Sequence, residues 1–323
     1  MTTTTATTIM ITGSRGFMAP HLIRALRRTH PKARLIAVHR APVRGHVACD
    51  LRDAAATRRL IARFKPALIY HLAGTTKPVG WNGMWQAHVQ TTLRLLEAAR
   101  LLPKSRRPRL VISGSSAEYG TAAGSKPINE ESSTLPATPY GATKLAQTLA
   151  ALSYRERGMD VVVARIFNAV GPGIPDNLAP GAFARQIARI ERGLQPARMS
   201  VGNLASVRDF IDVRDVAEAL IELGSPLLHQ PLYNVCSGRG VPIRGILRGL
   251  VALSKASIQV ANDPTRMTAS DLPRVVGDGR RLAAAAWKPA WALDQTLKDA
   301  LEWHRSLIDQ GTATHPRTTS TPG

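Results

Sequence analysis

The chain has 323 residues and a formal net charge of +21, and its length is enough for one large domain or two modest ones. Its two cysteines, Cys49 and Cys236, are too few for a disulfide framework or a structural zinc site, so we expect a cytoplasmic protein without a metal. The positive charge favours phosphate-bearing ligands, but the basic residues are spread along the chain and aromatic residues make up only 5%, so no nucleic-acid partner is expected.

The chain begins and ends in Thr-rich segments, residues 1–8 and 311–323. The first segment lacks the basic and apolar regions of a secretory signal, and we expect it to be flexible. The last segment also contains Pro and is predicted to be disordered. Between them no apolar stretch approaches the length of a membrane span, so no membrane partner is expected.

The first half alternates short apolar runs with longer helical patterns, which is typical of an α/β fold with a parallel sheet covered on both faces. Strands are predicted at residues 9–12, 35–38, 68–72, 110–112 and 161–165, and helices at 19–29, 54–64, 84–101 and 139–157. We therefore predict a Rossmann-type, doubly wound cofactor-binding domain over residues 9–168. The more irregular residues 169–310, with helices at 182–192, 213–223, 243–253 and 293–308, are predicted to form a smaller substrate-binding lobe with some return to the sheet.

A glycine turn directly after the first strand opens the first helix. Gly13 allows a sharp turn, Gly16 allows the backbone to approach a pyrophosphate, and the free N–H groups at the helix start face the anion. The predicted dinucleotide contacts in this turn are Gly13, Arg15, Gly16, Phe17 and Met18. A glycine-rich turn without a ligand is the competing interpretation.

The second strand is followed by Arg40, where NAD-binding proteins usually place a carboxylate. Arg40 and Arg15 are suited to the 2′-phosphate of NADP, so NADP(H) is preferred and NAD(H) is the alternative. Solvated surface arginines are the competing interpretation. Asp50 and Leu51 are candidates for the adenine side, although a helix N-cap by Asp53 is an equally ordinary use of this segment.

The strand at 68–72 is predicted to end against the cofactor. Leu72, Ala73 and Gly74 follow His71, and the small side chains would allow a close approach. His71 itself is interpreted as a buried strand residue.

Tyr140 and Lys144 lie one turn apart near the start of a predicted helix. A neighbouring ammonium favours the phenolate, which would bring Tyr140 toward proton transfer at neutral pH. Upstream, at the end of a strand, Ser115 or Ser116 would offer a hydroxyl to the substrate oxygen, and Glu118 is a further candidate acid.

With these motifs the sequence resembles the extended short-chain dehydrogenase/reductases, the sugar-nucleotide epimerases, dehydratases and reductases. The resemblance runs from Thr12 to about Asp278 and includes two further stretches, residues 165–173 and 207–216. It implies that Tyr140 is the acid/base, that Lys144 also holds the nicotinamide ribose, and that Ile166 contacts the cofactor. Its spacing rule selects Ser115 as the substrate-orienting hydroxyl, while a one-residue gap would select Ser116.

Within the family, residues 115–120, 182–191, 201–204 and 233–238 resemble most strongly those of reductases that convert GDP-4-dehydro-6-deoxy-D-mannose to GDP-D-rhamnose. It implies NADPH-dependent reduction of a C4 ketone, with Asn168 and Arg208 facing the sugar diphosphate and Gln186 reaching the guanine. A loop hydrogen bond and a surface ion pair are the structural alternatives for Asn168 and Arg208. The family's late Arg-Pro-Ser-Asp is replaced here by residues 268–271, Thr-Ala-Ser-Asp, so Arg266 would have to supply the missing guanidinium or the substrate differs.

Two other functions remain open at this point. A 4,6-dehydratase or C4 epimerase would keep the fold, and Glu118 would then be the acid that assists elimination of water. A non-enzymatic nucleotide-sensing or nucleic-acid-associated protein would keep the fold and use the charge. The resemblance also implies a homodimer in which the helices at 84–101 and 139–157 form a four-helix bundle.

Overall fold

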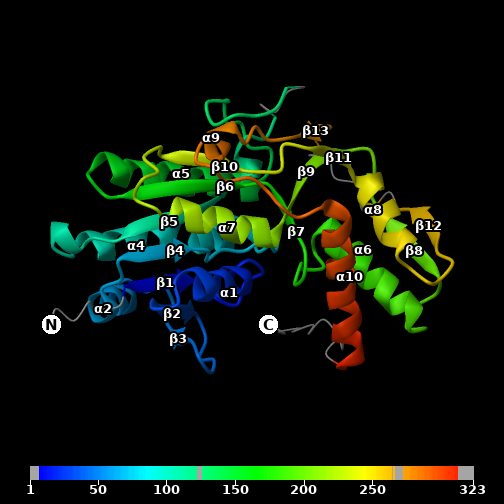
Figure 1. Cartoon of the computed structure of the whole chain (residues 1–323), viewed down its shortest axis with the longest axis horizontal. Helices are drawn as coiled ribbons and strands as arrows, with labels where there is room; N and C mark the ends of the chain where they lie inside the picture. Colours follow the sequence, from blue (N-terminus) through cyan, green and yellow to red (C-terminus); the bar gives the residue numbers. More distant parts are fainter. Residues whose placement is uncertain (1–6, 122–125, 264, 266–271, 312–323) are drawn as a thin grey trace.

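The computed structural model describes residues 7–121, 126–263, 265 and 272–311. Its centre is a seven-stranded sheet in the order β10-β6-β5-β4-β1-β2-β3, with every neighbouring pair parallel (Figure 1). The strands are β1 (Thr8–Thr12), β2 (Arg34–His39), β3 (Val47–Ala48), β4 (Leu68–His71), β5 (Arg109–Ser115), β6 (Val161–Ile166) and β10 (Leu232–Val235). The strand order reverses between β1 and β4, and the predicted doubly wound α/β fold is confirmed.

Helices cover both faces of this sheet because successive strand residues point to opposite sides. Along β1, Ile9 and Ile11 belong to one core cluster and Met10 to the other. The helices α1 (Ala19–Thr29) and α7 (Val213–Leu223) contribute to the first cluster. The second cluster contains residues of α2 (Ala54–Phe64), α4 (Thr91–Arg100) and α5 (Pro139–Glu156).

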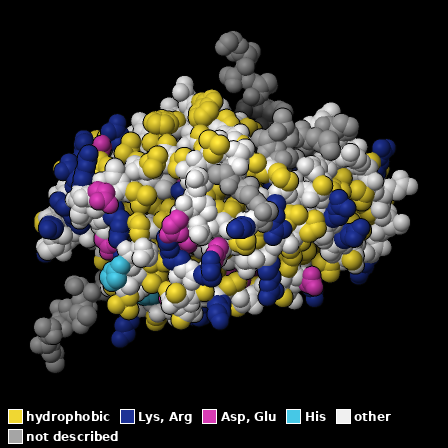
Figure 2. All heavy atoms as spheres, turned by 90° about the horizontal axis from the view of Figure 1, so that it is seen from above, with side chains coloured by type: hydrophobic (Ala, Val, Ile, Leu, Met, Phe, Trp, Pro, Cys, Tyr) yellow, Lys and Arg dark blue, Asp and Glu magenta, His cyan; other side chains and the backbone are white. Residues whose placement is uncertain are grey.

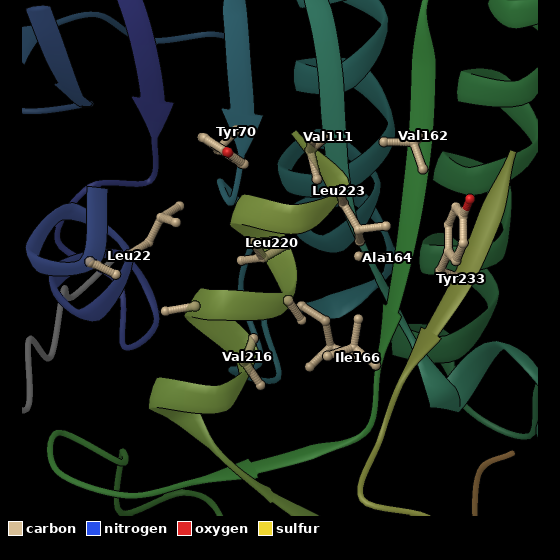
Figure 3. Packing of buried hydrophobic residues seen from close by; sticks show 14 of the residues in the cluster. Leu22, Tyr70, Val111, Val162, Ala164, Ile166, Val216, Leu220, Leu223 and Tyr233 are labelled. Atoms are coloured by element: carbon tan, nitrogen blue, oxygen red, sulfur yellow. The ribbon is translucent and has the colours of Figure 1, made fainter. Parts of the chain in front are cut away.

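The C-terminal half of the chain completes the sheet domain. Figure 3 shows α7 lying across the strands, with Val216, Leu220 and Leu223 directed toward Tyr70, Val111 and Ala164. The strand β10 adds Tyr233 at the edge of the same cluster. Together with β10, α7 is the return to the sheet that the sequence predicts, while the boundary at residue 169 stays a prediction.

A second lobe lies at one end of the sheet (Figure 1). Its core is formed by α6 (Ala179–Glu191), α8 (Ile243–Ala252) and α10 (Leu293–Asp309). The short strands β7 (Asn168–Val170), β9 (Val207–Asp212), β11 (Gly240–Pro242) and β13 (Arg274–Val275) form one small sheet, and β8 (Arg198–Val201) pairs with β12 (Gln259–Asn262). The short helix α9 (Arg280–Ala283) contacts β10. Most of these strands have only two to four residues, so hydrophobic alternation does not reveal them.

Two predicted elements differ from the structure next to the later site. The helix predicted at 84–101 begins earlier, as α3 (Gly80–Trp85), and passes through a π-helical turn, η1 (Gln86–Gln90), into α4. The strand predicted at 110–112 is longer, because its polar end pairs with β6 up to Ser115 before the 3₁₀ turn η3 (Ser116–Glu118). A second 3₁₀ turn, η2 (Lys104–Arg106), precedes β5.

Positively charged side chains are not confined to one patch of the face shown in Figure 2. Figure 2 shows Lys and Arg side chains spread over the face that is seen from above, with hydrophobic and acidic side chains between them. None of the helices in the described ranges has both the length and the apolar character that a bilayer crossing requires.

Candidate active site

A large cavity lies between the sheet and the second lobe. Its volume is about 940 Å³, and its lining runs from the turn after β1 and the end of β4, across the start of α5, to β8 and β9 in the lobe. The cavity therefore opens at the carboxyl ends of β1 and β4, where the strand order reverses and where open α/β sheets bind their ligands.

The turn after β1 lies close against the end of β4. Gly13 has a φ of +66°, and a Cβ atom there would lie 2.7 Å from the carbonyl oxygen of Leu72 and the amide nitrogen of Ala73. Only glycine allows this turn to lie so close to the end of β4. The helix α1 then begins without a side-chain cap and without an acidic residue in its first turn, which leaves its N-terminus suited to an anion.

Basic side chains gather beyond β2. Arg15 and Arg40 are exposed and lie outside the cavity lining. The pKa of His39 is lowered by burial first, and then by the charges of Arg15, His46 and Arg40. Arg15, Arg40 and the two histidines therefore form a basic group beside the end of β2, a kind of group that is suited to a phosphate.

The two adenine candidates are placed differently. The Asp50 carboxylate accepts from the Arg52 guanidinium, with Nη2 and Oδ2 2.5 Å apart, and this contact lowers the pKa of Asp50. The Leu51 side chain is buried in the core under α2, and the expected contact of this residue with the cofactor stays a prediction. Asp53 caps α2 by accepting from the amides of Ala55 and Ala56, the ordinary use that the sequence allowed.

Tyr140 and Lys144 both line the cavity from the first turns of α5. The helix starts at Pro139, and the Thr138 side chain caps it by accepting from the amide of Gly141. The Lys144 ammonium is buried and donates to the Ser113 carbonyl and to the Gln147 side-chain oxygen. Burial lowers the pKa of Lys144 to about 8.

The structure corrects the expected electrostatics of Tyr140. Burial raises the pKa of the phenol, a hydrogen bond with Ser115 opposes that shift, and the charge of Glu118 adds to it. The Lys144 ammonium one turn away donates to the Ser113 carbonyl and to the Gln147 side-chain oxygen. In this state the phenol holds its proton at neutral pH and is suited to act as an acid.

The strand-end residues separate into two groups. Ser115 and Ser116 line the cavity, and Ser115 is the one that forms the hydrogen bond with Tyr140. Glu118 is fully buried outside the lining, where its carboxylate accepts from the amide of Ser115 at 2.7 Å and from the Arg165 guanidinium at 2.8 Å. This placement does not favour the predicted role of Glu118 as a catalytic acid, because both of its oxygens accept hydrogen bonds outside the cavity lining.

One cavity residue that the sequence analysis missed is His88, which lies in the π-helical turn η1. Its ring packs edge-on against Tyr140, with ring centroids 5.5 Å apart. Burial first and then the charge of Lys144 lower its pKa to about 4. A regular helix over 84–101 gives no signal for this contact, since the π turn changes which side chains face α5.

The predicted substrate contacts lie toward the second lobe. Asn168, Gln186 and Arg208 line the cavity. Asn168 donates to the Asp209 carbonyl at 2.9 Å, and Arg208 donates to the Leu272 carbonyl at 2.7 Å. Gln186 accepts from the amide of Ser200 at 3.2 Å, so its side chain is anchored to β8. Arg266 falls outside the described residues.

The cavity brings together most of the residues predicted from sequence. Those in its lining are Gly13, Gly16, Phe17, Met18, Leu72, Ala73, Gly74, Ser115, Ser116, Tyr140, Lys144, Ile166, Asn168, Gln186 and Arg208. Beside His88, the lining contains residues that were not among the predicted contacts, including Thr75, Lys77, Phe183 and Asn203.

Comparison with known proteins gives consistent matches. The profile of the NAD dependent epimerase/dehydratase family matches residues 9–236. GDP-6-deoxy-D-mannose reductase of Pseudomonas aeruginosa is 34% identical over 311 residues, which cover 94% of this chain and 99% of the reductase. dTDP-6-deoxy-L-talose 4-dehydrogenase (NAD(P)(+)) of Kitasatospora kifunensis is 30% identical over 261 residues, or 80% of this chain and 77% of the dehydrogenase. The solved structure of RMD from P. aeruginosa, complexed with NADPH, has a TM-score of 0.81 and 31% identity, covering 93% of this chain and 99% of that chain.

Proposed function

Because the chain belongs to the NAD dependent epimerase/dehydratase family, we propose that it is an NADPH-dependent reductase of a 4-keto-6-deoxy sugar nucleotide, GDP-4-dehydro-6-deoxy-D-mannose, which it converts to GDP-D-rhamnose. The observation that carries this proposal is the cavity, where a protonated Tyr140 and Ser115 lie at the end of a dinucleotide-shaped path. The likeness to the P. aeruginosa reductase along nearly the whole chain supports the choice of substrate.

NADPH bound along the glycine turn supplies the hydride for the C4 carbon. Ser115 orients the C4 oxygen by a hydrogen bond, and Tyr140 donates its phenolic proton to that oxygen as negative charge develops on it. The carbonyl then becomes an alcohol, and the phenolate that remains is stabilised by Lys144 one helical turn away. Lys144 also holds the nicotinamide ribose in this proposal.

Reduction fits the site better than dehydration does. Elimination of water from C5 and C6 needs an acid beside the hydroxyl residue, and the only candidate that the sequence offered was Glu118. Its carboxylate is committed to Arg165 and to the Ser115 amide, outside the cavity. Reduction requires only the proton donor and the hydride.

The lobe end of the cavity is proposed to bind the nucleotide of the substrate. Arg208 and Asn168 lie where β7 and β9 meet the sheet domain, and they would face the diphosphate. Gln186 would reach the guanine from α6. On the cofactor side, the exposed pair of Arg15 and Arg40 favours NADPH over NADH.

A homodimer is proposed as the assembly. Along α5 an apolar stripe of Ala142, Leu145, Ala146 and Leu149 is left partly or fully exposed at helical spacing. Two tryptophans of α3, Trp81 and Trp85, are also exposed, and α3 contacts α5. Pairing of two such faces would bury them in a bundle of helices. We place the protein in the cytoplasm, consistent with its two free cysteines.

The decisive assay supplies purified protein with freshly made GDP-4-keto-6-deoxymannose and follows the loss of reduced nicotinamide, with NADH in parallel. We expect stoichiometric oxidation of NADPH, faster than that of NADH. Tyr140→Phe should lower the rate by about 10²–10⁴-fold, because the proton donor is lost while the ring remains.

Product analysis completes this test. Release of a GDP-linked 6-deoxyhexose with an alcohol at C4 would support the reductase. If neither cofactor is consumed by a folded, NADPH-binding protein, the reductase proposal fails, and unmodified GDP- and UDP-sugars should then be tested for dehydration or epimerisation.

A further inference from the structure

A π-helical turn interrupts the helix that lies against the catalytic end of α5. This turn, η1, joins α3 to α4, and threonine hydroxyls reinforce it: Thr91 donates to the Ala87 carbonyl at 2.7 Å and Thr92 to the His88 carbonyl at 2.6 Å. Single π turns within α-helices are rare and occur frequently at functional sites. Here the turn directs His88 into the cavity.

The His88 ring bridges two parts of the site. Its Nδ1 lies 2.9 Å from the Thr143 hydroxyl, which is on α5 and donates to the carbonyls of Pro139 and Tyr140. Its Nε2 lies 3.2 Å from the amide nitrogen and 3.0 Å from the carbonyl oxygen of Thr75. Because Thr143 donates its proton to a backbone carbonyl and the Thr75 amide donates to Nε2, the ring is satisfied as the neutral tautomer that carries its proton on Nδ1.

The loop after β4 is fitted closely to the same ring. A Cβ atom on Gly74 would lie 3.1 Å from His88 Cδ2 and 3.4 Å from its Nε2. The imidazole is almost completely buried, with 1% of its residue surface exposed. The ring therefore lies between two segments that line the cavity and keeps them apart. One is the loop from Ala73 to Thr75, and the other is the start of α5 with Tyr140.

We propose that His88 is a positioning residue that fixes the Tyr140 ring through Thr143 and the cofactor-facing loop through Thr75. This inference rests on the proposed function and adds to it a residue that acts through its neighbours and has no contact of its own with the reacting atoms. The two ring nitrogens have separate roles. Nδ1 holds Tyr140 in position through Thr143, and Nε2 holds the loop after β4 in position through Thr75.

Substitutions that keep one nitrogen each test the two tasks separately. In His88→Asn the amide occupies the region of Nδ1, and in His88→Gln it reaches the region of Nε2. We expect His88→Asn to keep kcat close to wild type but to weaken NADPH binding by about tenfold, the equivalent of one hydrogen bond. His88→Gln should keep the NADPH Kd and lower kcat by about 10²-fold, because Tyr140 is displaced. His88→Leu should lose both.

A buried histidine elsewhere serves as the control. His304 on α10 is 5% exposed, and His304→Leu should change the melting temperature while leaving kcat and the NADPH Kd at wild-type values. Equal kcat and Kd in wild type and all three His88 variants would overturn the inference, as would parallel losses that follow only the fraction of folded protein. If the wild-type protein does not reduce the ketone, the proposed function fails. The NADPH Kd values of His88→Asn and His88→Gln then still test the contact of Nε2 with Thr75.

Discussion

Ser115 and Ser116 are adjacent and both line the cavity, and Ser115 forms a hydrogen bond with Tyr140. Ser115→Ala should lower kcat by about 10²-fold, because it removes a hydrogen-bond donor from the developing alkoxide. Ser116→Ala removes a neighbouring hydroxyl and should leave kcat near wild type. Steady-state rates with the C4 ketone check this pair.

Folding must be measured on both serine variants. The Ser115 hydroxyl also caps η3 by accepting from the amide of Ala117 at 3.2 Å, and loss of such a cap costs about 1 kcal/mol. Thermal unfolding separates this cost from the catalytic one. A larger loss of kcat in Ser116→Ala than in Ser115→Ala would contradict the assignment.

At the scale of single residues, the sequence predicted those arrangements that depend on residues close together in the chain. Tyr140 and Lys144 share a helix face because they are four apart, and Gly13 follows a strand directly. Hydrogen-bond and ion-pair partners from distant segments could not be predicted from sequence spacing. The Glu118–Arg165 pair joins η3 to β6, and it removes Glu118 from the site for a reason that only the fold reveals. The hydrogen bond from the Lys144 ammonium to the Ser113 carbonyl likewise joins two segments that are far apart in the chain.

At the scale of elements, the regular strands and helices of the first half were predicted within a few residues. Periodicity identified them because each buries one continuous face. The π turn η1 and the short strands of the lobe were missed, because a single inserted turn or a strand of two to four residues leaves no repeated pattern. These irregular elements are the ones that bring His88 and the lobe residues to the cavity.

The exposed face of α5 leads to an element-scale prediction. Leu149 is 59% exposed on the apolar stripe, so Leu149→Arg should place a charge in the proposed dimer interface and yield monomers. Leu227→Arg is the matched control, since Leu227 is 78% exposed and lies outside the helices of the proposed bundle. Light scattering gives the molar mass of each. A wild-type protein with the mass of a single chain would exclude the dimer.

At the scale of the whole molecule, the parallel sheet and its switch point place the cofactor turn and the end of β4 side by side. The second lobe then closes the cavity from the other side, with Gln186 and Arg208 far along the chain from Tyr140. Lys and Arg side chains are spread over the face that Figure 2 shows, so the net charge of +21 favours anionic substrates in general and selects no particular one.

Burial of several histidines makes the stability of the whole molecule depend on pH. Burial lowers the pKa of His71 to about 3 and those of His88 and His304 to about 4, against 6.5 in the unfolded chain. Each histidine is therefore neutral in the folded protein and takes up a proton on unfolding below about pH 6.5. The stabilising contribution is complete above that pH and is lost as the pH falls toward 4.

His304 isolates one of these contributions. In His304→Leu one proton fewer is taken up on unfolding, so its free energy of unfolding should fall less steeply with acid, by about 1.4 kcal/mol per pH unit between the unfolded pKa of 6.5 and the folded pKa of about 4. Urea unfolding of both proteins at about pH 7, 6 and 5 measures the two slopes. Equal slopes would mean that His304 is protonated in the folded protein as readily as in the unfolded chain. That outcome would contradict the inference that burial lowers the pKa of His304. A difference of the expected size would support it, and His71 and His88 could then be measured in the same way.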